Sequence, residues 1–124
     1  MKYVKVIVSR WPRVRRPANL GKPILSQDIR AYTGTQEYVK NVPVNLVYVA
    51  DYSRMSEKDD AEKLAWSYAD TGFIAENVYL YCASEGLATV VRALIDRDKL
   101  AAIMKLRPEQ RITLSQSVGL HQTK

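Results

Sequence analysis

The chain has 124 residues, a formal net charge of +6, 47% hydrophobic and 26% charged residues, which is the composition of one small globular domain. Its single cysteine, Cys82, and single histidine, His121, exclude a disulfide framework and any zinc motif that needs several thiolates or imidazoles from one chain. No apolar run approaches about 20 residues, and Lys2 and Lys5 interrupt the first one, so we expect no membrane span, no secretory signal and a cytoplasmic location.

The positive charge is concentrated in residues 1–25, which contain seven basic side chains and no acidic ones. The rest of the chain has 12 basic and 13 acidic side chains and is nearly neutral. We therefore divide the sequence into a basic N-terminal arm, 1–25, and a folded domain, 26–124. The arm fits a solvated leader, a phosphate-gripping segment for nucleic acid, or a misplaced gene start or frameshift. A solvated leader is the interpretation we favour, so nucleic acid is not an expected partner.

Short elements are predicted in the first half of the chain. Residues 3–8 alternate in the manner of a strand, and Ser26 is suited to capping a helical turn over 26–29. Residues 35–40 indicate another short helix. The strongest strand pattern is 44–50, which is apolar on both faces and so implies layers above and below it.

A long helix is predicted over residues 59–85, with Ser56 and Asp59 resembling a capping box and Gly86 ending it. Residues of one predicted buried stripe recur at three- and four-residue spacing: Ala61, Leu64, Ala65, Tyr68, Gly72, Ala75, Tyr79 and Cys82. A second stripe follows in the C-terminal half: Phe73, Ile74, Asn77, Leu80 and Tyr81.

The length of this helix carries a consequence for assembly. If the helix is continuous, it would span about 40 Å, whereas a compact domain of this size has a diameter of about 35 Å. Either residues 70–72 break the helix or a second subunit covers part of it. We favour the second subunit, because one glycine costs only about 1 kcal/mol inside a helix.

The remaining elements complete a layered pattern. We predict a strand at 87–91, a helix that Asp96 caps and that ends before Pro108, and a last strand at 111–118. The order strand, helix, strand, helix, strand indicates an α/β layered arrangement. The last strand is predicted to place Ile112, Leu114 and Val118 on one face, and the other face would carry Thr113, Ser115 and Ser117.

Side chains suited to catalysis are scarce. The sequence has no glycine-rich dinucleotide motif, P-loop, C-x-x-C or H-E-x-x-H motif. We expect Cys82 to be a buried structural thiol, His121 to be an exposed tail residue and Gly34 to belong to a turn. We expect Asn77 to bond a backbone group across an interface. An enzyme of this composition would depend on a cofactor for its chemistry.

Several motifs in fixed order make the chain resemble the nitroreductase family, including its peptide azoline oxidase branch. They are Asp70, Gly72, Glu76, Asn77 and Leu80 on the long helix, E-G-L-A-T-V-V at 85–91, D-R-D-x-L at 96–100, V-P-V-N-L-V-Y-V-A-D at 42–51, and the ending Ser117-Val118-Gly119. The resemblance implies the C-terminal half of an α+β layered sandwich, truncated at the N-terminus. Its mixed sheet would be flanked by a long central helix and shorter helices.

The same resemblance implies a homodimeric FMN-dependent oxidoreductase that passes hydride from a nicotinamide or other small-molecule reductant. The flavin would lie at the dimer interface and would be contacted by the loop after the V-V strand, here Arg92, Ala93 and Leu94. The amides of Ala93 and Leu94 would face the polar edge of the ring, and Arg92 would stabilise negative charge on reduced flavin. No metal site and no catalytic side chain is implied.

A second hypothesis starts from the family's N-terminal phosphate-binding half, which this chain starts too late to contain. The protein would then be a cofactor-free structural or interaction protein that retains the dimer core. Binding of FMN separates this hypothesis from the first.

Overall fold

The structure, a computed structural model, describes residues 3–10, 25 and 27–121. Its elements follow one another along the chain as β1 (Val4–Arg10), η1 (Arg30–Tyr32), η2 (Glu37–Lys40), β2 (Val44–Asp51), η3 (Tyr52–Arg54), α1 (Asp60–Glu85), β3 (Ala88–Arg92), α2 (Arg97–Ile103) and β4 (Gln110–Gly119). The three η elements are short 3₁₀ helices. One of them, η2, covers part of the helix predicted over 35–40.

The four described strands form one sheet in the order β1-β2-β4-β3, and every neighbouring pair is antiparallel. The predicted α+β layered fold is confirmed, but the described sheet is antiparallel rather than mixed. Strands β2 and β3 do run in the same direction, as a helical crossover requires. Strand β4 lies between them and is antiparallel to both, so no parallel pair forms.

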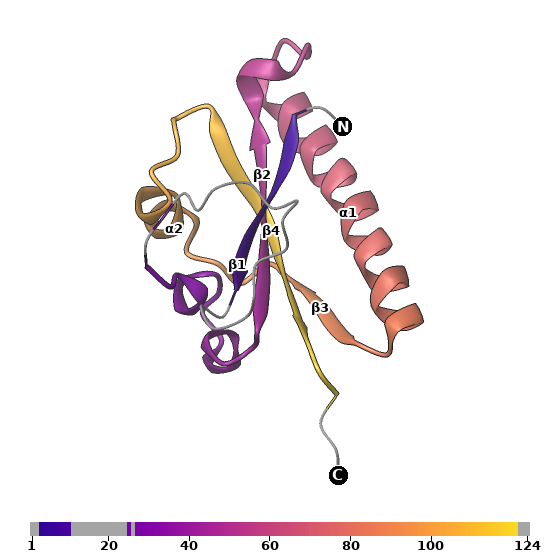
Figure 1. Cartoon of the computed structure of the whole chain (residues 1–124). Coiled ribbons are helices and arrows are strands. Elements are labelled where there is room, and N and C mark those ends of the chain that lie inside the picture. Colours follow the sequence, from indigo (N-terminus) through magenta and orange to yellow (C-terminus); the bar gives the residue numbers. More distant parts are fainter. Residues whose placement is uncertain (1–2, 11–24, 26, 122–124) are drawn as a thin grey trace.

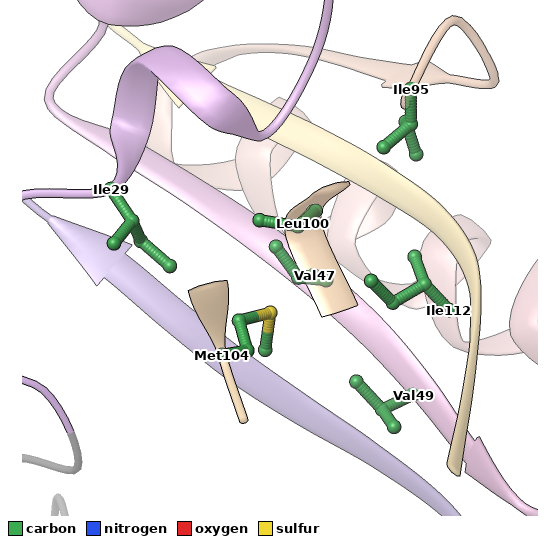
Figure 2. Close-up of a cluster of buried hydrophobic side chains, with 7 residues drawn as sticks. All are labelled: Ile29, Val47, Val49, Ile95, Leu100, Met104 and Ile112. Atoms are coloured by element: carbon green, nitrogen blue, oxygen red, sulfur yellow. The ribbon is translucent and has the colours of Figure 1, made fainter. Parts of the chain in front are cut away.

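Helices cover both faces of the sheet (Figure 1). Helix α1 packs on one face, and α2, η1 and η2 lie on the other side. The central strand β2 is buried on both faces, as its sequence predicts, with Val47, Tyr48 and Ala50 all fully buried. On the α2 side, one apolar cluster joins the sheet to the helices (Figure 2): Ile29, Val47, Val49, Ile95, Leu100, Met104 and Ile112.

An irregularity in β4 changes which face its side chains occupy. The register pairs Val47 with Ser115 and Val49 with Ile112, so two residues of β4 lie opposite Tyr48. This β-bulge interrupts the two-residue alternation. Ile112 therefore joins the cluster on the α2 side, whereas Leu114 packs on the α1 side. The prediction that these two residues share a face is wrong for this reason.

Helix α1 is continuous over 26 residues, so residues 70–72 do not break it. The predicted capping box does not form: the N-cap is Asp59, whose carboxylate accepts from the amide of Glu62 at 2.8 Å. Gly86 ends the helix in the left-handed conformation, with φ of 68°, which a residue without a Cβ adopts at little cost. Asp96 caps α2 as predicted.

The buried face of α1 differs from the predicted stripe. Its fully packed positions are Ser67, Thr71, Ala75 and Cys82. Four of the residues in the predicted stripe are exposed instead: Ala61, Leu64, Ala65 and Gly72. Thr71 forms a hydrogen bond with Thr113 on the bulge of β4, 2.8 Å between their hydroxyl oxygens.

The predicted basic arm contributes to the sheet. Strand β1 lies within residues 1–25 and pairs with β2 along its whole length. The arginine-rich part of the arm, 11–24, and the Ser26 cap lie outside the described residues. Among the helices that are described, none is long and apolar enough to cross a membrane.

A buried carboxylate at the end of β2 makes the fold sensitive to acid. Asp51 accepts from the amide of Ser53 at 3.0 Å and from its hydroxyl, and Nη2 of Arg107 lies 2.8 Å from the other oxygen. The hydroxyl of Ser53, helped by the charge of Arg107, holds the pKa of Asp51 below its usual value of 3.8. The charged form thus contributes stability above that value, and the contribution is lost as the pH falls through the lowered pKa.

We expect Asp51→Asn to lower the free energy of unfolding by about 1–3 kcal/mol at pH 7, because it removes a charged acceptor from these donors. The difference from the parent should shrink as the pH is lowered well below the usual pKa. Urea unfolding across this range measures both quantities, with Asp98→Asn, at an exposed carboxyl on α2, as the control. An equal loss at neutral and acidic pH would contradict the prediction.

Candidate functional site

A buried arginine joins three strands on the face of the sheet opposite α1. Arg92, the last residue of β3, is only 5% exposed. Its Nε donates to Oγ of Ser117 at 2.9 Å, and its Nη2 donates to Oδ1 of Asn45 at 3.0 Å. Ser117 also donates to the same oxygen of Asn45 at 2.7 Å. Because Asn45 and Ser117 are paired across β2 and β4, the sheet register itself builds this cluster.

No carboxylate of the described residues forms an ion pair with Arg92; its acceptors are neutral oxygens. Burial lowers the pKa of the guanidinium, and the phenol of Tyr38 acts weakly in the opposite direction. A guanidinium tolerates this environment better than an ammonium, because it is weakly hydrated and distributes its charge over five N–H donors. The arrangement therefore depends on nearly every donor finding an oxygen.

The segment Thr33-Gly34-Thr35 supplies the remaining acceptor and covers the guanidinium. The carbonyl of Thr33 accepts from Nη1 of Arg92 at 2.9 Å and from Oγ of Ser115 at 2.9 Å. Gly34 is buried against this group, and a Cβ there would collide with Nη1. The glycine permits a close approach and does not have a positive φ, so the prediction of a glycine-dependent turn is wrong.

The three predicted flavin-binding residues have different environments. The side chain of Arg92 is buried and donates to protein oxygens, whereas Ala93 and Leu94 are exposed, Leu94 by 61%. The carbonyl of Leu94 accepts from the amide of Thr35 at 3.0 Å. Among the hydrogen bonds of the described residues, none uses the amides of Ala93 or Leu94. The end of β3 thus carries two adjacent N–H donors that have no acceptor among the described residues.

The other face of the sheet carries an apolar groove of about 360 Å³ between the C-terminal half of α1 and the ends of β2 and β4. The residues that line it are Val44, Leu46, Ile74, Asn77, Val78, Tyr81, Cys82 and Val118. Large apolar side chains also point outward along α1: Leu64, Trp66, Phe73, Leu80 and Tyr81, each more than half exposed. An apolar surface of this extent marks an interaction face.

Other polar groups are unsuited to acid–base catalysis. Tyr48 is fully buried and donates to Oε1 of Gln116 at 2.6 Å. Burial raises the pKa of its phenol to about 12. Cys82 is buried as predicted, and His121 is exposed. Asn77 is exposed and lines the groove. Within the described part of the chain, no cluster of histidine, cysteine and carboxylate side chains could hold a metal ion.

Comparison with known proteins gives a consistent assignment. A family model described as "Nitroreductase family" matches residues 2–120 of the chain. No curated protein matches the sequence.

Solved structures share the same fold. A protein of Ralstonia eutropha, provisionally named a nitroreductase, is 41% identical over 78% of the chain, with a TM-score of 0.71. An FMN-dependent nitroreductase of Clostridium difficile is 14% identical over the whole chain, with a TM-score of 0.67. The E. coli microcin synthetase complex McbBCD contains a chain 17% identical over 97% of this one, with a TM-score of 0.78. This chain spans 46%, 66% and 52% of the length of the matched chain in these structures, respectively.

The hydrogen bonds from Arg92 to its neutral acceptors should contribute to the stability of the fold, because they compensate for burial of the guanidinium charge. We expect Asn45→Leu to lower the free energy of unfolding by about 3–5 kcal/mol, because it leaves a buried guanidinium without its amide acceptor. It also removes the donor to the carbonyl of Val39, 2.8 Å away. The control is Asn41→Leu at an exposed position, and chemical denaturation is the measurement. Equal effects of the two substitutions would contradict this account.

Proposed function

Because the chain belongs to the nitroreductase family, we propose that it is an FMN-dependent oxidoreductase in which two copies share the flavin at their interface. Within the family, we favour the branch that includes the peptide azoline oxidases, on the sequence motifs. The observation that carries the proposal is that Ala93 and Leu94 are exposed residues whose amides have no acceptor among the described residues.

These amides fit the ring system of a flavin. Its pyrimidine edge presents two carbonyl oxygens and unprotonated ring nitrogens, which accept hydrogen bonds from backbone donors in a fixed direction, and one ring N–H that donates. Backbone N–H groups also stabilise negative charge on the ring without needing a titratable side chain. When bound, FMN would supply the hydride chemistry between a nicotinamide or other small-molecule reductant and the substrate. The part of this chain is to bind and orient the ring.

Dimerisation is proposed from the outward face of α1. Phe73 and Leu80 lie two turns apart on this helix and are 66% and 61% exposed. Burying one such side chain contributes about 1.5–3 kcal/mol, so a row of them favours association. A second copy of the same helix would cover this row and would explain why a helix as long as the domain has apolar residues on two sides.

The alternative is an interaction protein that keeps this dimer but binds no cofactor. Its motivation is that the described residues offer donors for the ring edge but no identified grip for the phosphate group of FMN. Both hypotheses predict a dimer, so only flavin binding separates them. Purified protein with the near-ultraviolet and blue absorbance of a bound flavin, or that acquires it on incubation with FMN, supports the oxidoreductase. Protein that stays colourless supports the alternative.

Removing one amide donor tests the ring contact directly. We expect Ala93→Pro to weaken FMN binding by about two- to tenfold, because proline has no N–H and one net hydrogen bond to a neutral acceptor of the oxidised ring contributes about 0.5–1.5 kcal/mol. Ala93→Ser keeps the amide and is the matched control, which should bind as the parent does. Flavin fluorescence titration measures both affinities, and equal weakening by the two variants would contradict the proposed contact.

Charges on the apolar row test the dimer. We expect the double variant Phe73→Glu with Leu80→Glu to be monomeric, since two carboxylates would have to be desolvated at the interface. Sedimentation velocity at micromolar concentration measures the change, and Glu62→Gln at an exposed position in the first turn of α1 is the control. A parent protein that is itself monomeric would refute the shared site.

A further inference from the structure

We infer that the segment Thr33-Gly34-Thr35, held by the guanidinium of Arg92, is a positioning device that fixes the amides of Ala93 and Leu94 in the direction a flavin requires. This inference rests on the proposed function and deepens it. In this inference Arg92 positions the backbone that would contact the flavin and does not itself contact the reduced flavin. It also adds residues of η1 and its neighbouring loop to a site that the sequence placed in 92–94 alone.

The first step of the argument is that the segment is anchored to the sheet by side chains. The carbonyl of Thr33 receives two hydrogen bonds at 2.9 Å, one from Arg92 on β3 and one from Ser115 on β4. The side chain of Thr33 is fully buried and donates back to the carbonyl of Arg30 at 2.8 Å. These bonds fix the position of Thr33 relative to the end of β3.

The second step is that the segment also holds the chain on the C-terminal side of the amides of Ala93 and Leu94, which form the donor pair. The amide of Thr35 donates to the carbonyl of Leu94 at 3.0 Å. Ile95, the next residue, is buried in the apolar cluster of the α2 side. Arg92 thus anchors the chain before the two free amides, and Leu94 with Ile95 anchors it after them. The short stretch between these anchors therefore has little freedom to change the direction of its two N–H groups.

The third step concerns the side chain that is missing at Gly34. A Cβ there would collide with Nη1 of Arg92 and would lie 3.3 Å from the carbonyl oxygen of Leu94. A Cβ at Gly34 would therefore contact both groups that anchor the donor pair, the guanidinium of Arg92 and the carbonyl of Leu94. Only glycine lets the segment approach the guanidinium and the Leu94 carbonyl at once, so Gly34 is the point at which the device is most easily disturbed.

The fourth step explains why the cation is an arginine. Arg92 reaches Ser117, Asn45 and Thr33 through different nitrogens of one planar group. A lysine carries its three N–H donors on one nitrogen, which would have to lie within hydrogen-bond distance of all three oxygens at once, whereas the guanidinium reaches each from a separate nitrogen. Donors that are already aimed bind a ligand more tightly and stabilise developing charge better than donors that must first be ordered.

The experiment compares Gly34→Ala and Arg92→Lys with Arg97→Lys. The control arginine also bonds to β4, through Nε and Nη2 to the carbonyl of Thr113, but it does not contact the donor pair. Hydrogen exchange is measured first, without flavin. We expect the amide of Thr35 to exchange at least tenfold faster in the two site variants, while amides at the centre of α1 keep their protection in all three proteins.

FMN affinity and unfolding free energy are then measured on the same proteins. We expect Gly34→Ala and Arg92→Lys to bind FMN about tenfold more weakly or worse, and Arg97→Lys to bind as the parent does even where it is equally destabilised. Faster exchange at Thr35 with unchanged FMN affinity would overturn the inference and leave the proposed function standing. So would unchanged exchange at Thr35 in both site variants. A parent protein that binds no FMN would overturn the proposed function, and this inference with it.

Discussion

A guanidinium group buried among neutral oxygens sets the arrangement of the candidate site. Burying a charge without a carboxylate partner is expensive, and the cost is offset only if its donors are satisfied. The acceptors of Arg92 come from β2, from β4 and from the loop after η1, which are far apart in the sequence. The sheet register already places Asn45 and Ser117 side by side, and the bond from Arg92 to the carbonyl of Thr33 ties the loop after η1 to them. The amides of Ala93 and Leu94 follow directly after this point of convergence.

The two faces of the sheet differ in how completely the chain covers them. The α2 side combines an apolar cluster with the Arg92 network and so supports the end of β3 from behind. The α1 side leaves a groove and a row of large apolar side chains uncovered in the single chain. If two copies share a flavin as proposed, the α2 side would orient the ring and the α1 side would contact the second copy. This division explains how a small domain can contribute to a cofactor site without enclosing one.

Features that depend on local chemistry could be predicted from the sequence, and features that depend on contacts between distant segments could not. The long helix, its glycine end and the Asp96 cap follow from periodicity and capping residues, and all three are confirmed. The insertion of β4 between β2 and β3 is a question of strand order, which no local pattern encodes. The same holds for the bulge that separates Ile112 from Leu114. The role of Gly34 was missed because its closest neighbour, Arg92, is far away in the sequence.

A site built from backbone amides shifts the sequence requirement away from the residues that would touch the ligand. Ala93 and Leu94 are exposed, so many other side chains could occupy these positions with the amides unchanged. The residues behind them are far more constrained, because Gly34 has no room for a side chain and Arg92 has no equivalent substitute. A chain with one histidine and one cysteine can therefore still form such a site. In the proposed site, specificity would reside in the packing that aims the donors, rather than in the chemistry of the groups that would meet the flavin.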